Sequence, residues 1–97
     1  MWYRRDGSPC EDLQEFGRLF QDINYKRVKR DFLKNGKLVS TVWLGIDHGL
    51  HHENGPLIFE TMVFSDTENY LELDTARYKT ELEATDGHER MVKKWSL

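Results

Sequence analysis

The residues of this sequence that could do chemistry are histidines and carboxylates. His48 and His52 lie four residues apart, and Glu60 and His88 follow later in the chain. Histidine nitrogens and carboxylate oxygens are common ligands of zinc and related divalent ions. A spacing of four would place both histidines on one side of a helix, but glycines and a proline in this segment disfavour a helix. We therefore expect a polar surface loop with no metal or cofactor, and keep these four residues as an alternative metal or ligand site.

His88 and Glu60 also have structural explanations. His88 falls on the apolar side of a predicted helix, where we expect a buried histidine hydrogen-bonded to Glu60 or Asp47. Glu60 interrupts an apolar strand, and a buried carboxylate needs a partner such as Arg77 or His88. The sequence contains no recognisable set of nucleophile, base and orienting group, and no glycine-rich phosphate-binding motif. We therefore predict that the protein is not an enzyme.

Charge is distributed unevenly along the chain, although the net charge is only −3. An acidic stretch would suit a protein partner with a basic surface. Its candidate partner-binding residues are Asp47, Glu53, Asp66, Glu68, Glu72 and Asp74. A basic stretch comes before it and could contact the phosphates of a nucleic acid. Its residues are Lys26, Arg27, Lys29, Arg30, Lys34 and Lys37.

Two observations weigh against binding of nucleic acid by the basic stretch. Successive side chains of a regular strand point to opposite faces, so Arg27 and Lys29 would lie opposite Lys26 and Arg30. The sequence pI of about 5.8 is also low for a nucleic-acid-binding domain. Binding to nucleic acid is therefore kept as an alternative function.

Capping signals indicate where two helices begin. Ser8 is followed by a proline and, three residues after Ser8, by a glutamate, which predicts a helix over residues 9–21. Thr80 and Glu83 form a similar capping box and predict a second helix. Gly87 lies inside that helix, where glycine is unfavourable, so we expect a close contact between its backbone and the sheet.

The remaining segments predict β-strands. Apolar and alternating patterns indicate strands over residues 25–33, 38–46, 56–64 and, more briefly, 70–73. The sequence Asn35-Gly36 between the first two is a strong hairpin signal. A two-residue loop would pair Leu33 with Leu38, Phe32 with Val39, and Val28 with Trp43.

These elements predict one compact α+β domain over residues 1–97. We expect a three- to five-stranded, mostly antiparallel sheet with both helices packed on one face. The composition, 38% hydrophobic and 32% charged, is too polar for a membrane protein. The single cysteine, Cys10, cannot form an intrachain disulfide, and no secretory signal is visible, so we expect a cytoplasmic protein.

Three segments resemble a group of small, uncharacterised bacteriophage and prophage proteins. They are Val39-Ser40-Thr41-Val42-Trp43-Leu44-Gly45-Ile46-Asp47-His48, Pro56-Leu57-Ile58-Phe59-Glu60-Thr61-Met62-Val63-Phe64, and Arg77-Tyr78-Lys79-Thr80-Glu81 followed by Glu83-Ala84 and Gly87-His88. The resemblance implies a phage or prophage origin and a site of action in the cytoplasm of a bacterial host. It supplies no mechanism.

The sequence thus favours a phage-type accessory protein that binds a host or phage protein with a basic surface. An inhibitor of a bacterial defence system, anti-CRISPR-like or of another kind, is one concrete form. A nucleic-acid-binding module and a small metal- or ligand-binding protein are the alternatives. We expect a monomer or a homodimer, because an exposed edge strand could pair with its copy.

Overall fold

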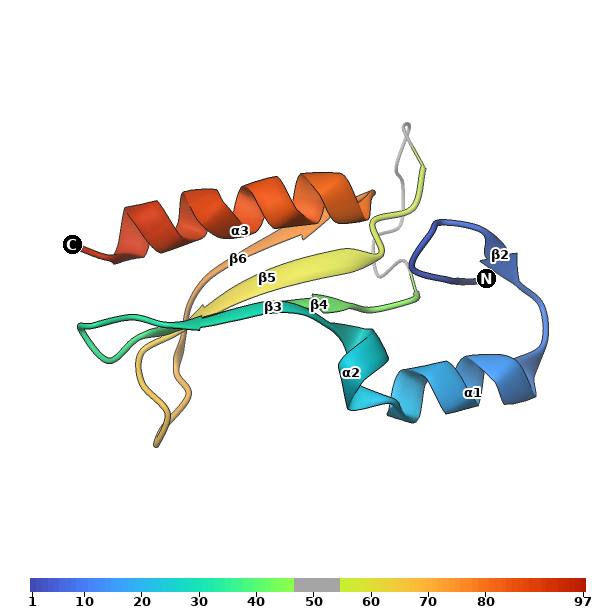
Figure 1. The fold of residues 1–97 in the computed structure, drawn as a ribbon, viewed down its shortest axis with the longest axis horizontal. Helices are drawn as coiled ribbons and strands as arrows, with labels where there is room; N and C mark the ends of the chain where they lie inside the picture. Colours follow the sequence, from blue (N-terminus) through green and yellow to red (C-terminus); the bar gives the residue numbers. More distant parts are fainter. Residues whose placement is uncertain (47–54) are drawn as a thin grey trace.

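A four-stranded antiparallel sheet forms the centre of the molecule, in the order β3-β4-β5-β6 (Figure 1). The computed structural model describes residues 1–46 and 55–97. In chain order the elements are β1 (Trp2–Tyr3), β2 (Pro9–Cys10), α1 (Leu13–Gln21), α2 (Ile23–Lys26), β3 (Arg27–Phe32), β4 (Leu38–Trp43), β5 (Phe59–Phe64), β6 (Glu72–Tyr78) and α3 (Glu81–Trp95). The predicted α+β class, an antiparallel sheet with helices packed on it, is confirmed.

The helix α3 covers one face of the sheet (Figure 1). Alternate positions of the two central strands point toward it. These side chains are completely buried: Val39, Thr41, Trp43, Phe59, Thr61 and Val63. Such alternation is typical of an antiparallel sheet that packs only one face on a core.

The helix α1 joins this core from the end of the sheet. Phe16, its buried residue, packs between Trp2 and Trp43, with ring centroids 5.4 and 5.5 Å away. The Trp43 indole N–H donates to the Tyr3 carbonyl at 3.1 Å. The aromatic residues of α1 and β1 therefore attach the N-terminal segment to the sheet.

The predicted start of the first helix at Pro9 is wrong. Pro9 lies in β2, which pairs with β1. Ser8 cannot cap a helix here, because its N–H and its hydroxyl both bond to the Asp6 carboxylate. Asp12 caps α1 instead and accepts hydrogen bonds from two N–H groups of the first turn.

The predicted register of the β3–β4 hairpin is also wrong. The Leu33 N–H donates to the Lys37 carbonyl at 2.8 Å, which leaves three residues in the loop. Gly36 adopts the left-handed conformation, with φ of 91°, that this longer loop requires. Phe32 therefore pairs with Leu38, and the other predicted pairings shift accordingly.

A β-bulge interrupts the alternation of β3. Arg27 pairs with Val42, whereas Lys29 pairs with Thr41, the adjacent residue of β4, so Val28 is the extra residue. The residues before the bulge were predicted to continue the strand but form the short helix α2. The bulge thus decides which basic side chains share a face.

The other strands differ from prediction at their ends. β4 stops at Trp43 rather than at residue 46, and β5 begins at Phe59 rather than at residue 56. The last strand occupies Glu72–Tyr78 instead of residues 70–73. Tyr70 has φ of 52° and cannot belong to a strand, which delays the start of β6.

The helix α3 begins where predicted. The Glu83 N–H donates to the Thr80 hydroxyl at 3.1 Å. The expected close contact at Gly87 is confirmed, because a Cβ atom placed there would lie 2.2 Å from the ring of Tyr78. No helix within the described ranges is long and apolar enough to cross a membrane.

Candidate binding face

His88 lies in a buried chain of hydrogen bonds between α3 and the sheet. Its Nδ1 is 2.6 Å from the Thr41 hydroxyl, which is 2.5 Å from the Thr61 hydroxyl, and its Nε2 is 2.7 Å from the Asp31 carboxylate. The chain is consistent if Thr61 donates to Thr41, Thr41 donates to Nδ1, and the Nε2–H donates to Asp31. The predicted burial of His88 is confirmed, but Asp31 takes the place expected for Glu60.

The order hydroxyl, imidazole, carboxylate in this chain is also the order of a catalytic triad. However, the Thr41 side chain is completely buried beneath α3. A substrate could not approach its hydroxyl without displacing the helix. We interpret the chain as a structural link between α3 and the sheet.

Three potential metal ligands lie together at the Asp31 end of these hydrogen bonds. Ligand atoms of Asp31, His88 and Glu89 all lie within 4.8 Å of one another. The 2.7 Å between Nε2 and the Asp31 oxygen is a direct hydrogen bond, and the Lys29 ammonium pairs with Glu89. A hydrogen bond and an ion pair therefore explain the cluster without an ion.

The four sequence-predicted metal ligands are not brought together by the described structure. Glu60 points to the face of the sheet opposite His88 and pairs with Arg77 at 2.9 Å, one of its two predicted partners. His48 and His52 lie outside the described residues. Among the residues that can be placed, Glu60 and His88 cannot share one ion.

The predicted acidic partner-binding residues are in several different environments. Asp66 accepts hydrogen bonds from two backbone N–H groups of the turn after β5, and these bonds lower the pKa of its carboxyl group. Asp74 is bonded to α3. Glu68 and Glu72 are exposed, whereas Asp47 and Glu53 lie outside the described residues.

Asp74 should make stability depend on acid pH. Its carboxylate accepts hydrogen bonds from the Lys94 ammonium at 2.8 Å and the Trp95 indole at 3.0 Å, which lower its pKa from the ordinary value of 3.8. A lowered pKa contributes stability that is present above the unfolded-state pKa and is lost as pH falls through the folded-state pKa. The excess stability of the wild type over Asp74→Asn should therefore disappear in acid, measured by thermal unfolding from neutral pH to about pH 2. A constant difference across this range would contradict the assignment.

The second face of the sheet is bordered by α1 and α2 at one end and is otherwise not covered by any described helix. We call it the open face; its rows across β3, β4, β5 and β6 are Arg27-Val42-Glu60-Arg77, Arg30-Ser40-Met62-Thr75 and Phe32-Leu38-Phe64-Glu72. An antiparallel sheet usually presents polar side chains to water. Here the central strands instead present mostly apolar ones, and Phe32 on the edge strand is 63% exposed.

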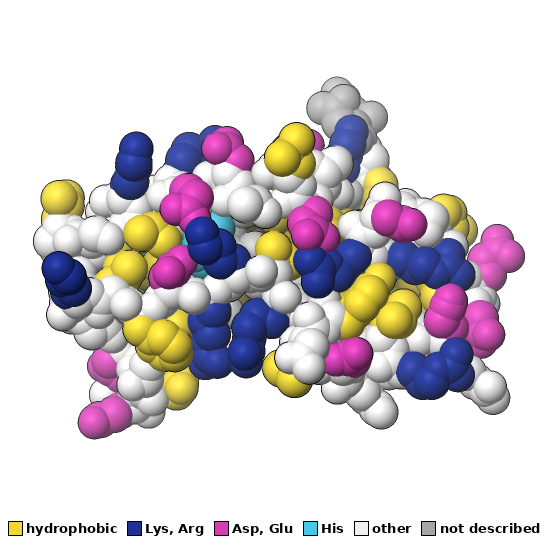
Figure 2. All heavy atoms as spheres, in the orientation of Figure 1, with side chains coloured by type: hydrophobic (Ala, Val, Ile, Leu, Met, Phe, Trp, Pro, Cys, Tyr) yellow, Lys and Arg dark blue, Asp and Glu magenta, His cyan; other side chains and the backbone are white. Residues whose placement is uncertain are grey.

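Basic residues gather at the α2 end of the open face. Lys26, Arg27 and Arg30 line one pocket, because the bulge places Arg27 and Arg30 on the same side. Figure 2 shows Lys and Arg side chains grouped beside hydrophobic ones below α3. Lys29 instead points to the covered face and pairs with Glu89. The predicted separation of Arg27 from Arg30 is therefore wrong.

The pocket beside these cations has a volume of about 240 Å³. Its walls come from α1, α2, β3 and β4 and from the residue after β4. The lining residues are Phe20, Ile23, Lys26, Arg27, Arg30, Ser40, Val42 and Leu44. The Lys26 ammonium lies 3.9 Å from the centroid of the Phe20 ring, and the Arg30 guanidinium lies 5.1 Å from that of Phe32.

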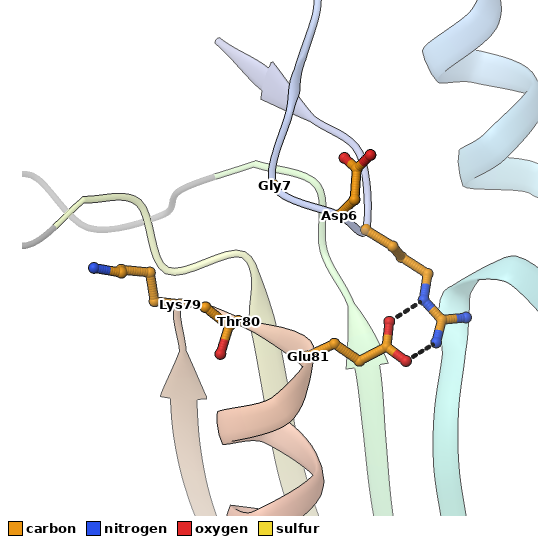
Figure 3. A pocket seen from close by; sticks show the side chains of 6 residues that line it. Asp6, Gly7, Lys79, Thr80 and Glu81 are labelled. Carbon is orange, nitrogen blue, oxygen red and sulfur yellow. Dashed lines mark hydrogen bonds and ion pairs between the residues drawn. The ribbon is translucent and has the colours of Figure 1, made fainter.

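A second pocket, of about 210 Å³, lies between the N-terminal turn and the start of α3 (Figure 3). Arg5 and Glu81 meet there at 2.6 Å, and Arg5 also donates to the Tyr25 carbonyl at 3.0 Å. The charges of this pair are thus matched within the fold. In Figure 3 the Lys79 side chain points away from them. The ion pair between Arg5 and Glu81 links the N-terminal segment to α3.

The sequence did not reveal the apolar part of the open face. The strands of Val42 and Met62 are apolar on both faces, so their pattern assigns neither residue to a face, and the helical spacing of Phe20 from Phe16 predicts a core position. Phe20 is instead 40% exposed. No protein-family model, curated protein or solved structure matches this chain.

Proposed function

We propose that this protein acts by binding another protein through the open face of its sheet. The observation that supports this most is the apolar centre of that face, where Val42, Met62 and Phe64 are only half-buried. Contiguous apolar surface on a small domain is typical of an interaction site. The exposed Phe32 at one end supplies an aromatic side chain of the kind enriched in interfaces.

The partner we propose is a host or phage protein, in keeping with the resemblance of the sequence to phage proteins. Inhibition of a bacterial defence system remains one form that this binding could take. The surface differs from the acidic one expected from the sequence, because Asp66 and Asp74 are bonded within the fold. Nucleic acid is the second candidate, since Lys26, Arg27 and Arg30 lie together.

A pair of matched variants tests the open face. Met62→Glu introduces a charge at the centre of the face, whereas Leu82→Glu introduces the same charge on α3, where Leu82 is 82% exposed. Tagged wild type and both variants are used to capture proteins from nuclease-treated host lysate. We expect a stoichiometric protein with wild type and Leu82→Glu, and at least about tenfold less of it with Met62→Glu.

Folding of Met62→Glu is checked by its circular dichroism spectrum and unfolding temperature. Val42→Lys, at another position of the open face, provides an independent test if Met62→Glu is unstable. Equal capture by folded Met62→Glu and wild type would overturn the proposed function. Capture that depends on intact nucleic acid would favour the second candidate instead.

A further inference from the structure

We propose that the pocket at the α2 end of the open face binds an acidic segment of the partner protein, with one bulky apolar side chain inserted between the cations. This inference rests on the proposed function and specifies the chemistry of the partner. It concerns the pocket formed by Phe20, Ile23, Lys26, Arg27, Arg30, Ser40, Val42 and Leu44.

The size and walls of the pocket indicate a side chain as its occupant. Its volume of about 240 Å³ is below the roughly 300–1,000 Å³ of pockets that enclose a whole small-molecule ligand. Ile23, Val42 and Leu44 give it aliphatic walls. A bulky apolar side chain would bury these walls and thereby be held by the hydrophobic effect.

The rim of the pocket indicates negative charge beside that side chain. Within residues 1–46 and 55–97, no carboxylate forms an ion pair with Lys26, Arg27 or Arg30. The nearest carboxylate in the row of Arg27 is Glu60, which is paired with Arg77. As far as residues 1–46 and 55–97 are concerned, the three cations can pair with carboxylates of a partner, which would increase the association rate and favour acidic sequences.

The aromatic rings favour a protein over a single-stranded nucleic acid. Bases bind such proteins by stacking on free aromatic faces. Lys26 lies over the Phe20 ring, and Arg30 over the Phe32 ring, so each ring already has a cation on one face. Cation–π contact holds the two cations in place without neutralising their charge. The other apolar walls of the pocket, Ile23, Val42 and Leu44, are aliphatic, so Phe20 supplies the one lining ring on which a base could stack.

Selection of linear peptides from a random display library tests this inference. We expect wild type to enrich peptides in which an aromatic or large aliphatic residue is flanked by Asp or Glu. The affinity of a selected peptide for Arg27→Glu/Arg30→Glu should fall by about 10- to 100-fold, because both attractions become repulsions. The control Arg90→Glu/Lys93→Glu carries the same charge change on the exposed side of α3 and should keep wild-type affinity.

The outcomes separate this inference from the proposed function. Peptides that lose affinity with Met62→Glu but not with Arg27→Glu/Arg30→Glu would overturn the charge assignment and leave the open face as the binding surface. Enrichment of peptides without acidic residues, or of none, would also overturn it. If a single-stranded DNA oligonucleotide binds wild type more tightly than the selected peptides do, the partner is a nucleic acid. Arg27→Gln/Arg30→Gln, with a smaller expected loss, replaces the reversal if that variant is unfolded.

Discussion

Replacing Gly87 by alanine should destabilise the protein by about 2–4 kcal/mol, although alanine is the better helix former. The added Cβ atom would lie 2.2 Å from both the terminal ring carbon and the hydroxyl oxygen of Tyr78. α3 would have to move away from β6, or the Tyr78 ring would have to leave its position. Urea unfolding monitored by tryptophan fluorescence measures the change in the free energy of unfolding.

Gly17→Ala is the matched control for this experiment. Gly17 also lies inside a helix, α1, but a Cβ atom placed there meets nothing within 4 Å. This substitution should stabilise the protein by up to about 1 kcal/mol. In a Tyr78→Leu background, which removes the outer ring atoms, most of the cost of Gly87→Ala should disappear. An unchanged cost in that background would show that the contact with Tyr78 is not its cause.

Replacing His88 by alanine should reduce the free energy of unfolding by about 3–5 kcal/mol. The substitution leaves a cavity between α3 and the sheet, and it removes the hydrogen-bond partner of the Thr41 hydroxyl and of the Asp31 carboxylate. Because Thr41 is fully buried, water cannot replace its bond without entering the core, whereas the Asp31 carboxylate, whose side chain is 41% exposed, can bond to water. Thermal and urea unfolding both measure the effect.

The two threonines bonded in line with His88 test the central position of Thr41 in this hydrogen-bond network. Thr41 bonds to both His88 and Thr61, whereas Thr61 has Thr41 as its side-chain partner. Valine has nearly the shape of threonine, so each substitution removes mainly a hydroxyl group. Thr41→Val should cost about 2 kcal/mol and leave Nδ1 without a donor, and Thr61→Val about 1 kcal/mol. A larger loss of stability for Thr61→Val than for Thr41→Val would contradict the central position of Thr41 in this network.

Local signals in the sequence predicted the second helix and the existence of the hairpin. The capping box at Thr80 acts within one turn of helix, and the glycine of Asn35-Gly36 supplies a left-handed residue wherever the hairpin turns. The loop length was not predictable in this way. It depends on whether Leu33 pairs with Lys37, a contact between the two ends of the loop that the Asn35-Gly36 signal does not specify.

The composition of the candidate site was harder to predict than the fold. Regular alternation placed Arg27 and Arg30 on opposite faces, and only the extra residue at Val28 brings them together. A bulge has no strict sequence signal, because it is stabilised by the contacts of the residue that it displaces. Val28 packs against the core cluster around Trp43, and this contact stabilises the bulge.

The partner of His88 depended on contacts between distant parts of the chain. Asp31 is 57 residues away in sequence and reaches His88 only because β3 and α3 pack together. Glu60 was one of the two expected partners, because it interrupts an apolar strand. Its neighbours Phe59 and Thr61 point toward α3, so Glu60 must point to the other face.

If the open face binds a partner as proposed, the lifetime of the protein in a cell would depend on the supply of that partner. Anything that binds only the folded state raises the free energy of unfolding, by about 2.7 kcal/mol when the partner is at 100 times its dissociation constant. Proteases act on the small unfolded fraction, so copies without a partner would be degraded first. The amount of protein would then follow the amount of partner, with no dedicated regulator of its synthesis.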